Sequence, residues 1–378
     1  MPPGALSIQH HFADLPDPRR QHGQLHRLLD ILVIALSAVI AGSNTWQEVE
    51  TFARRRRDWL ARFLDLPNGV PSHDTFERVF DRLDPLALQR CLLSWLTAVP
   101  HRLRIGHIAI DGKTARRSGS PARGIQALHL VSAWATEHSL TLGQVATEEK
   151  SNEITAIPEL LELLDLEGAL VTIDAMGCQK AIAARIVEGG GDYVLTVKDN
   201  QERLREDVVE CLCAAMDDES VSRDTYEYED KGHGRTEKRA ITVVNDPEGI
   251  RDQEQWPGLK VVGSYYVERT LAGKTSEEIR FFIGSRDMTA KQCGEAIRGH
   301  WRIENGQHWS LDVSFREDDS RIQKRDGGAN FALLRKVALS LLKRHPSKDG
   351  INRKRYAAAL DTSFLEEILT SADKLGDV

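Results

Sequence analysis

The chain has 378 residues, of which 41% are hydrophobic and 28% are charged, and its formal net charge is −7. This composition is typical of a folded globular protein and excludes a low-complexity or disordered chain. The longest apolar run extends from Ile31 to Ala41. It is shorter than the ~20 residues that a bilayer-spanning helix needs, so we expect no membrane association.

The cysteine content and the distribution of charge indicate the cellular compartment and the kind of partner. The five cysteines are odd in number and form no CxxC pair, which favours a reducing cytoplasm. The negative net charge argues mildly against nucleic-acid binding, but basic residues are concentrated locally. Eleven Lys or Arg residues lie between Arg321 and Arg355, four form the run Arg54–Arg57, and a third group begins at Lys113. Local basic patches beside acidic side chains are what a DNA-cutting enzyme needs.

The first hundred residues are predicted to be helical. Leucines recur near helical spacing from Leu25 to Leu36, and a second apolar segment runs from Trp46 to Ala53. The tetrapeptide Ser72-His73-Asp74-Thr75 suits the start of a further helix, and Asp84-Pro85 suits another. We therefore expect residues 1–100 to form an all-α N-terminal domain.

From about residue 101 the pattern changes to strands separated by two helices. The expected order is three strands, a helix, a strand, a helix and a strand, at 107–111, 127–136, 140–147, 154–164, 170–174, 178–188 and 193–197. This order is that of an RNase H-like α/β fold, and 101–200 is predicted as the first part of that core. In such a fold the first and fourth strands are neighbours.

The rest of the chain divides into three segments. Residues 201–288 contain a short acidic helix and four strand-like runs, which we interpret as a β-rich insertion. Residues 289–345 are predicted to complete the core with a long helix from Thr289 to about Leu311 and a second helix from Ala329 to Lys343. Residues 346–378 are predicted to form a C-terminal tail.

Two aspartates and a glutamate are the candidate catalytic residues. Asp111 and Asp174 each end a predicted strand, and Glu304 lies in the long helix. A single strand-end aspartate usually accepts hydrogen bonds in a turn. Two carboxylates at the ends of adjacent strands repel each other unless a cation lies between them. Three such oxygen ligands suit a two-metal site for phosphoryl transfer.

The surroundings of Glu304 distinguish it from the other acids of the chain. His300, Glu304 and His308 follow at intervals of four residues and form one helical stripe, which Trp301 and Trp309 flank. A glutamate among aromatic and histidine side chains is expected to face a cleft. We interpret the two histidines as neutral groups that support the site or contact phosphate. This interpretation is favoured over a role as metal ligands.

Basic residues close to the predicted strand ends are candidate DNA contacts. Lys113 and Arg116 follow Asp111, and Lys198 follows the fifth strand. These side chains could position the scissile strand through its phosphates. The alternative is that they lie in solvated loops.

Several sequence blocks carry a resemblance to a known family. They are Ile110-Asp111-Gly112-Lys113-Thr114, Ile173-Asp174-Ala175-Met176-Gly177-Cys178-Gln179, and Trp301-Arg302-Ile303-Glu304-Asn305 with His308-Trp309 and Leu311-Asp312-Val313. They resemble the signature blocks of DDE transposases, and more narrowly those of the H-repeat-associated transposases of bacterial insertion sequences. The segment Phe12–Arg19 and the turn Gly232-His233-Gly234-Arg235 resemble the same subgroup.

The resemblance implies a function for the three acids. Asp111, Asp174 and Glu304 would bind two Mg²⁺ or Mn²⁺ ions and catalyse DNA cleavage and strand transfer by two-metal phosphoryl transfer. The implied partners are double-stranded DNA, as transposon ends and target, and a second copy of the chain in a synaptic homodimer. The implied location is the bacterial cytoplasm, in association with the nucleoid.

One part of the third block departs from the family pattern. Related transposases place a Tyr, an Arg and a Lys at fixed offsets around the glutamate, where this chain has Ile297, His300 and Leu311. The roles of those residues are therefore not carried over. Arg298 and Arg302 are the candidates to replace them in contacting DNA.

Three alternatives stay open at this point. A structure-selective RNase H-like DNA nuclease would have the same carboxylates without strand transfer. A catalytically silent, DNA-binding transposase remnant would have lost cleavage. A glycosidase could use Asp111 and Asp174 as paired carboxylates, but it would work in EDTA.

Overall fold

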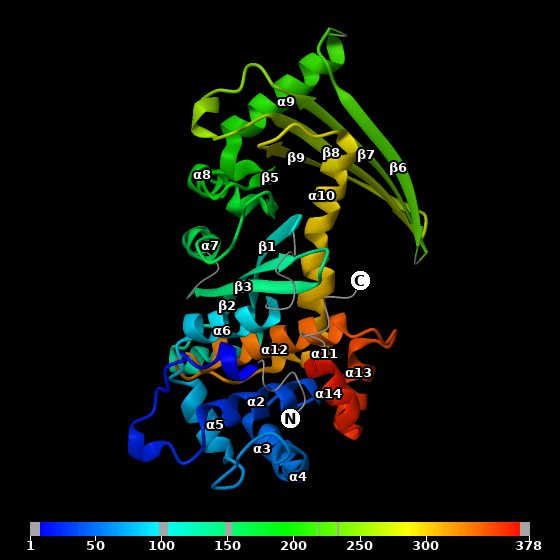
Figure 1. Cartoon of the computed structure of the whole chain (residues 1–378). Coiled ribbons are helices and arrows are strands. Elements are labelled where there is room, and N and C mark those ends of the chain that lie inside the picture. Colours follow the sequence, from blue (N-terminus) through cyan, green and yellow to red (C-terminus); the bar gives the residue numbers. More distant parts are fainter. Residues whose placement is uncertain (1–7, 98–104, 148–152, 219, 233, 371–378) are drawn as a thin grey trace.

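The computed structural model describes residues 8–97, 105–147, 153–218, 220–232 and 234–370. The predicted boundary near residue 100 and His233 of the quoted turn lie outside these ranges. The molecule is elongated, with a layer of helices at one end and a large sheet that occupies the rest (Figure 1). In the described part of the chain, no helix is long and apolar enough to cross a membrane.

The helical layer combines both ends of the chain. Its members from the first hundred residues are α2 (Leu28–Ile40), α3 (Trp46–Arg55), α4 (Arg57–Leu60), α5 (His73–Phe80) and α6 (Pro85–Thr97). Its members from the C-terminal part are α12 (Gly327–Arg344), α13 (Ile351–Leu360) and α14 (Thr362–Thr370). The segment predicted as a C-terminal tail thus carries two helices, and both pack against α2.

Aromatic packing joins these two groups of helices. The ring of Trp46 lies 4.7 Å from that of Phe80 and 4.7 Å, edge-on, from that of Phe331 on α12. The fully buried face of α2 packs along α12. The helices of the first hundred residues therefore share one apolar core with the C-terminal helices, and burial of these side chains stabilises the layer.

The nine strands found in the described residues belong to one sheet, in the order β3-β2-β1-β4-β5-β9-β8-β7-β6. β1 is antiparallel to β2 and parallel to β4, β4 is parallel to β5, and β5 is antiparallel to β9. The bounds are β1 (His107–Thr114), β2 (His129–Ala135), β3 (Leu140–Thr147), β4 (Leu170–Ile173), β5 (Asp192–Val197), β6 (Asp224–Gly232), β7 (Arg235–Asn245), β8 (Val261–Leu271) and β9 (Lys274–Gly284).

The predicted adjacency of the first and fourth strands is confirmed. Ile110 of β1 is the register partner of Ile173 of β4, so Asp111 and Asp174 follow neighbouring positions at the same edge of the ladder. The predicted end of β1 was wrong, because pairing with β2 continues from Asp111 to Thr114. Asp111 therefore lies within β1, at the point where only its pairing with β4 stops.

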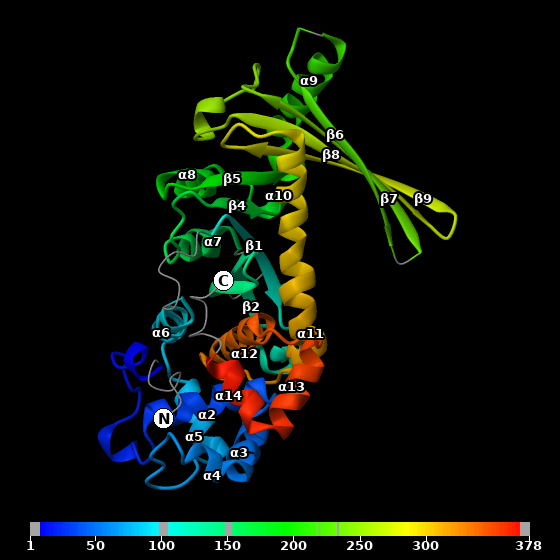
Figure 2. The same ribbon diagram turned by 45° about the vertical axis from the view of Figure 1, so that its right-hand side comes forward.

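Helices cover both faces of the strands that carry the aspartates. α7 (Glu153–Leu161) and α8 (Lys180–Glu188) pack on one face, and α10 (Ala290–Ile303) packs across β1, β4 and β5 on the other (Figure 2). Because both faces are covered, β4 is buried along its whole length and consists of the unbroken run Leu-Val-Thr-Ile.

The four strands of the predicted β-rich insertion continue this sheet. β9 pairs with β5 from Val194↔Gly284 to Val197↔Phe281. β6 to β9 form an antiparallel meander that curves away from the rest of the sheet (Figure 2). α9 (Glu202–Asp217) connects β5 to this meander. Only β5 thus separates the meander from β4, the strand that Asp174 follows.

The long helix predicted from Thr289 to Leu311 is divided into three parts. α10 ends at Ile303, a π-helical segment spans Glu304–His308, and α11 spans Trp309–Phe315. A capping box at Thr289 starts the helix, since its hydroxyl accepts from the Gln292 N–H while the Gln292 side chain accepts from the Thr289 N–H. The predicted extent is close, but the change in helical type at Glu304 was not predicted.

Candidate active site

The three candidate acids lie on three different elements around the C-terminal end of β4. Asp111 lies in β1, and Asp174 follows β4 directly. Asp174 caps a short 3₁₀ turn, because its Oδ1 accepts from the Met176 N–H at 3.0 Å. Glu304 begins the π segment after α10. Asp174 and Glu304 are exposed to solvent, whereas Asp111 is partly buried.

Two of the three carboxyl groups have raised pKa values. Burial raises the pKa of Asp111 to about 7, and the negative charges of Asp174, Glu304 and Glu153 add to this effect. Loss of hydration also raises the pKa of Glu304, where Asp174 acts in the same direction and Arg280 opposes it. Perturbed carboxylates that share a site are a mark of functional positions.

Asp174 and Glu304 also line the same cavity, which we call the carboxylate cavity. It has a volume of about 160 Å³ and lies between β4, β5 and α10. The other polar side chains in its lining are Thr172, Thr196, Lys198, Arg280 and His300, with Trp301 beside them. Lys198, one of the predicted DNA contacts, is therefore placed close to both acids.

The donor chemistry of this site suits a hard divalent cation. Carboxylate oxygens are the ligands that Mg²⁺ and Mn²⁺ prefer, and a bound cation would offset the repulsion that raises the pKa of Asp111. Among the residues that the structure describes, no three His, Cys, Asp or Glu side chains are already gathered as a metal-binding group. Asp111, Asp174 and Glu304 are the residues that could hold the ions after side-chain adjustment.

The π-helical segment sets the position of Glu304. A π segment inserts an extra residue into a helix and is frequent at functional sites. Within this one, the buried Gln307 side chain donates to Thr141 Oγ1 of β3 at 2.7 Å. This hydrogen bond fixes the segment against the sheet. Nothing in the spacing of apolar residues around Glu304 distinguishes a π turn from an α turn.

Both predicted histidines lie next to the acids and are held neutral. His308 Nδ1 lies 3.5 Å from Asp111 Oδ2, and burial lowers the pKa of His308 to about 3. His300 Nδ1 lies 3.2 Å from Thr172 Oγ1, and burial also lowers its pKa. Thr172 contacts a third histidine, His107, at 2.8 Å. Neutral imidazoles can orient neighbouring groups by hydrogen bonds without adding charge.

The sequence analysis did not predict a buried pair of polar side chains near Asp111, His129 and Glu153. His129 Nε2 donates to Glu153 Oε1 at 2.6 Å, and Thr114 Oγ1 lies 2.7 Å from His129 Nδ1. Both His129 and Glu153 are buried. A Cβ at Gly112 would lie 2.7 Å from Glu153 Cδ and 2.7 Å from His129 Nε2. Glycine beside Asp111 therefore allows this pair to pack directly on the strand, and the motif Asp-Gly is the only sequence signal for it.

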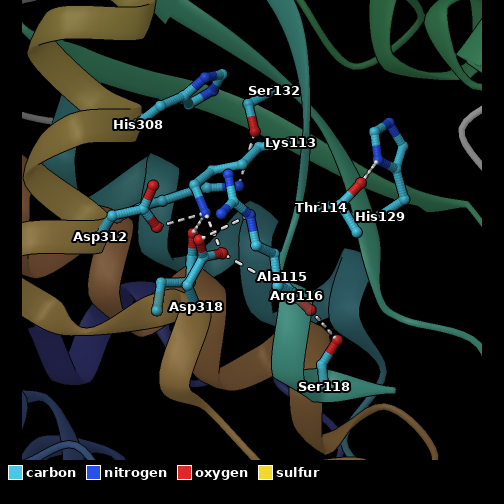
Figure 3. A network of polar contacts seen from close by, with 12 residues as sticks. Lys113, Thr114, Ala115, Arg116, Ser118, His129, Ser132, His308, Asp312 and Asp318 are labelled. Atoms are coloured by element: carbon cyan, nitrogen blue, oxygen red, sulfur yellow. Dashed lines mark hydrogen bonds and ion pairs between the residues drawn. The ribbon is translucent and has the colours of Figure 1, made fainter. Parts of the chain in front are cut away.

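The structure surrounds Lys113 with acidic partners (Figure 3). Its ammonium lies 2.7 Å from Asp312, 3.2 Å from Glu317 and 3.3 Å from Asp318. Its side chain is 11% exposed, compared with 83% for Arg116. Lys113 thus ties β1 to the segment that follows α11, a role that the sequence did not indicate. Arg116 stays open to solvent, and DNA contact by either residue remains a prediction.

The remaining predicted DNA contacts lie on α10. Arg298 and Arg302 line a larger cavity between α10 and the strands β7 to β9, together with Arg280 and Trp301. Arg298 Nη2 lies 3.4 Å from Asp230. The basic cluster between Arg321 and Arg355 has a different environment, because Arg335, Lys336, Lys354 and Arg355 are buried.

Comparison with known proteins identifies the family of this chain. Residues 102–341 match the family model described as "Transposase DDE domain", and residues 9–96 match the one described as "DDE_Tnp_1-associated". The chain is 42% identical over 376 residues to "Putative transposase YncI" of Escherichia coli O157:H7, covering 98% of this chain and 96% of that protein. It is 38% identical over 371 residues to "H repeat-associated putative transposase YhhI" of E. coli K12, covering 97% and 98%.

A third relative is a short protein. "Inactive transposase YbfQ" of E. coli K12 is 38% identical over 72 residues, which are 19% of this chain and 86% of that protein. The family matches cover most of the chain, and the first two relatives are matched over nearly their whole length. The chain belongs to the DDE transposases and is related to the H-repeat-associated proteins.

Proposed function

We propose that this protein cleaves and rejoins the DNA of a bacterial insertion sequence, with Asp111, Asp174 and Glu304 as its metal-binding catalytic triad. The observation that supports this most strongly is that the fold brings together three carboxylates from positions far apart in the sequence: Asp111 and Asp174 follow paired positions of β1 and β4, and Asp174 and Glu304 line one cavity. Burial raises the pKa of Asp111 to about 7, and the negative charges of Asp174 and Glu304 add to this effect. Such repulsion is unfavourable in a purely structural cluster and useful in a site that binds cations.

The order and direction of the strands support an RNase H-like core. β3, β2 and β1 form an antiparallel unit, and β4 and β5 extend it in parallel to β1. The segment 201–288 is then a β-rich addition at the β5 edge, through the β5–β9 pairing. In this proposal the first hundred residues, including the exposed Arg54, Arg55 and Arg57, contact the ends of the element through their phosphates.

The side chains around the triad have separable roles in this reaction. Two Mg²⁺ or Mn²⁺ ions held by the triad would supply Lewis-acid stabilisation of the attacking and leaving oxygens. His308 Nδ1, 3.5 Å from Asp111 Oδ2, is proposed to orient this carboxylate, and the contact of Thr172 Oγ1 with His300 Nδ1 holds the second imidazole. Lys198 and Arg280 in the carboxylate cavity place cationic groups where a scissile phosphate would lie.

The proposed partners are double-stranded DNA and a second copy of the chain. Transposon ends must be brought together before they are joined to a target, so we propose a homodimer in the synaptic complex. We further propose that the protein acts at the nucleoid of a bacterial cell.

Strand transfer separates the transposase from a nuclease with the same core. The experiment supplies the full-length protein and Mg²⁺ with pre-cleaved duplexes of the element's termini and a plasmid target. Joined products support the transposase, whereas cleavage of uncut duplexes without any joining supports the structure-selective nuclease. Absence of both activities in Mg²⁺ and Mn²⁺ supports a silent, DNA-binding remnant. The relative YbfQ is itself named an inactive transposase.

A further inference from the structure

A second and larger cavity lies beside the carboxylate cavity. It has a volume of about 520 Å³ and is formed by β7, β8, β9 and α10. We call it the arginine pocket, because six arginines line it: Arg235, Arg239, Arg269, Arg280, Arg298 and Arg302. Arg280 and Trp301 line both cavities. A ligand that extends beyond the carboxylates in this direction would therefore enter the arginine pocket.

The charge of this lining is opposite to that of the whole chain. Six guanidinium groups face three glutamates, Glu237, Glu278 and Glu295, and Asp230 also pairs with Arg239 and Arg298, which leaves two positive charges in excess. The chain as a whole carries a net charge of −7. The concentration of cationic side chains in one cavity therefore does not follow from composition, and it produces a local field that attracts anions.

One buried carboxylate organises the strand side of the pocket. Glu237 on β7 has a side chain that is 3% exposed, and it accepts from Arg269 Nε at 2.6 Å. Arg235 Nε lies 3.4 Å from it, and Arg239 forms a further ion pair with it. Arg269 is also the register partner of Glu237 on β8. A single guanidinium balances one carboxylate, so the other two carry charge that Glu237 does not neutralise.

The helix side of the pocket presents arginines next to aromatic rings. The guanidinium of Arg280 lies 4.7 Å from the centre of the Trp301 ring. The guanidinium of Arg298 lies 5.6 Å from the centre of the Tyr228 ring. Stacking on a ring holds a guanidinium plane in place. Arg280 Nε already donates to Glu278 and Arg298 Nη2 to Asp230, so only the remaining N–H groups of each guanidinium can donate to an anion. Arg302 is exposed one turn below Arg298.

We propose that the arginine pocket binds the phosphodiester backbone of a DNA strand whose scissile bond lies at Asp174 and Glu304. Guanidinium groups bind phosphate oxygens through paired N–H donors, and a cavity of this size holds more than one phosphate. The inference rests on the proposed function and assigns to the strands β7 to β9 the role of a DNA-binding surface. Contacts of this kind position the strand and do not depend on base sequence.

The test measures DNA affinity of the full-length protein as a function of salt. The probe is a fluorescein-labelled duplex of random sequence, followed by fluorescence anisotropy in EDTA at increasing KCl. Arg302→Gln and Arg269→Gln are the test variants, and Arg185→Gln is the matched control. Arg185 lies on α8, is 42% exposed and pairs with Glu162, compared with 49% exposure for Arg269. Thermal melting confirms that each variant is folded.

The expected result is a loss of affinity in both test variants. Each lost phosphate contact lowers the slope of log K against log salt concentration by about one, with a fall in affinity of roughly tenfold at ~0.1 M salt. Arg185→Gln is expected to match the wild type. Wild-type affinity and slope in folded Arg302→Gln and Arg269→Gln would overturn the proposal.

Cleavage assays separate this proposal from the proposed function. Cleavage that depends on Asp174, together with unchanged binding by Arg302→Gln, would overturn the pocket assignment and leave the triad standing. Loss of binding by Arg302→Gln in a protein that neither cleaves nor joins DNA would support the pocket and overturn the proposed catalysis.

Discussion

His308 Nδ1 lies 3.5 Å from Asp111 Oδ2, and this contact joins the π segment after Glu304 to the strand that carries the first aspartate. Burial lowers the pKa of His308 to about 3, so the imidazole is neutral at neutral pH. It cannot balance the charge of Asp111, whose own pKa is raised to about 7. The carboxylate therefore gains stabilisation from a proton or from an added cation.

The stability of the metal-free protein is predicted to report this imbalance. A folded-state pKa of about 7, against an ordinary value of 3.8, means that the folded state binds more protons than the unfolded state between these values. Stability from this group is full below pH ~4 and is lost as the pH rises through ~7. Asp111→Asn should thus be more stable than wild type at pH 8, by up to about 4 kcal/mol.

Urea denaturation in EDTA from pH 4 to pH 8 measures this difference. The advantage of Asp111→Asn should grow with pH, and added Mg²⁺ should raise the stability of the wild type more than that of the variant. A stability difference between the two proteins that is constant across this pH range would show that the pKa of Asp111 is not raised in the folded state.

Gly112→Ala is predicted to disturb the position of Asp111. The new Cβ would lie 2.7 Å from both Glu153 Cδ and His129 Nε2, so the buried pair or the strand must shift. We expect a loss of stability of about 1–3 kcal/mol and a fall in DNA cleavage of roughly tenfold or more, because small displacements of catalytic groups are costly. Cleavage rates and urea denaturation measure the two effects.

Gly23→Ala is the matched control for this substitution. A Cβ at Gly23 would meet nothing within 4 Å, so both cleavage and stability should stay close to wild type. Wild-type cleavage by Gly112→Ala would show that the His129–Glu153 pair does not constrain Asp111.

Lys113→Met is predicted to destabilise the fold strongly. Burial opposes the charge of Lys113, but Glu317, Asp312 and Asp318 together raise the pKa of the lysine. The Glu317 side chain is 2% exposed, and removal of its cation would leave a buried carboxylate without compensation. Such changes cost about 3–5 kcal/mol, which urea denaturation at pH 7 would measure.

Lys324→Met provides the comparison for Lys113. Lys324 forms an ion pair of 2.6 Å with Glu77, but its side chain is 69% exposed. Exposed ion pairs contribute little to stability, so this variant should be close to wild type. Equal effects of the two substitutions would contradict the structural role given to Lys113.

The strand that precedes Asp174 could be predicted from the sequence, because a strand that is buried on both faces is an unbroken run of apolar residues. The run Leu-Val-Thr-Ile before Asp174 is apolar throughout, and helices cover it on both sides. The end of β1 could not be predicted in this way. Its pairing with β4 ends at Ile110, but the antiparallel pairing with β2 extends three residues beyond Asp111.

Other parts of the site depend on contacts that no local pattern reveals. His129 and Glu153 are 24 residues apart, and only the fold places them against Gly112. The charge of the segment 321–355 also does not indicate which of its basic residues are buried. Lys336 lies inside the protein, where it donates to Ser132 and Gln144 at 2.7 and 2.8 Å. Domain boundaries and DNA contacts remain predictions.

That Asp111, Asp174 and Glu304 act as one metal-binding catalytic unit is tested most directly by Asp174→Asn. The measurement is Mg²⁺-dependent cleavage of a terminal DNA duplex by the full-length protein, with anisotropy in EDTA as the control for DNA binding. We predict that cleavage falls to background in Asp174→Asn, as in Asp111→Asn and Glu304→Gln, while duplex affinity stays within about twofold of wild type. Cleavage retained by folded Asp174→Asn would contradict the assignment of the triad.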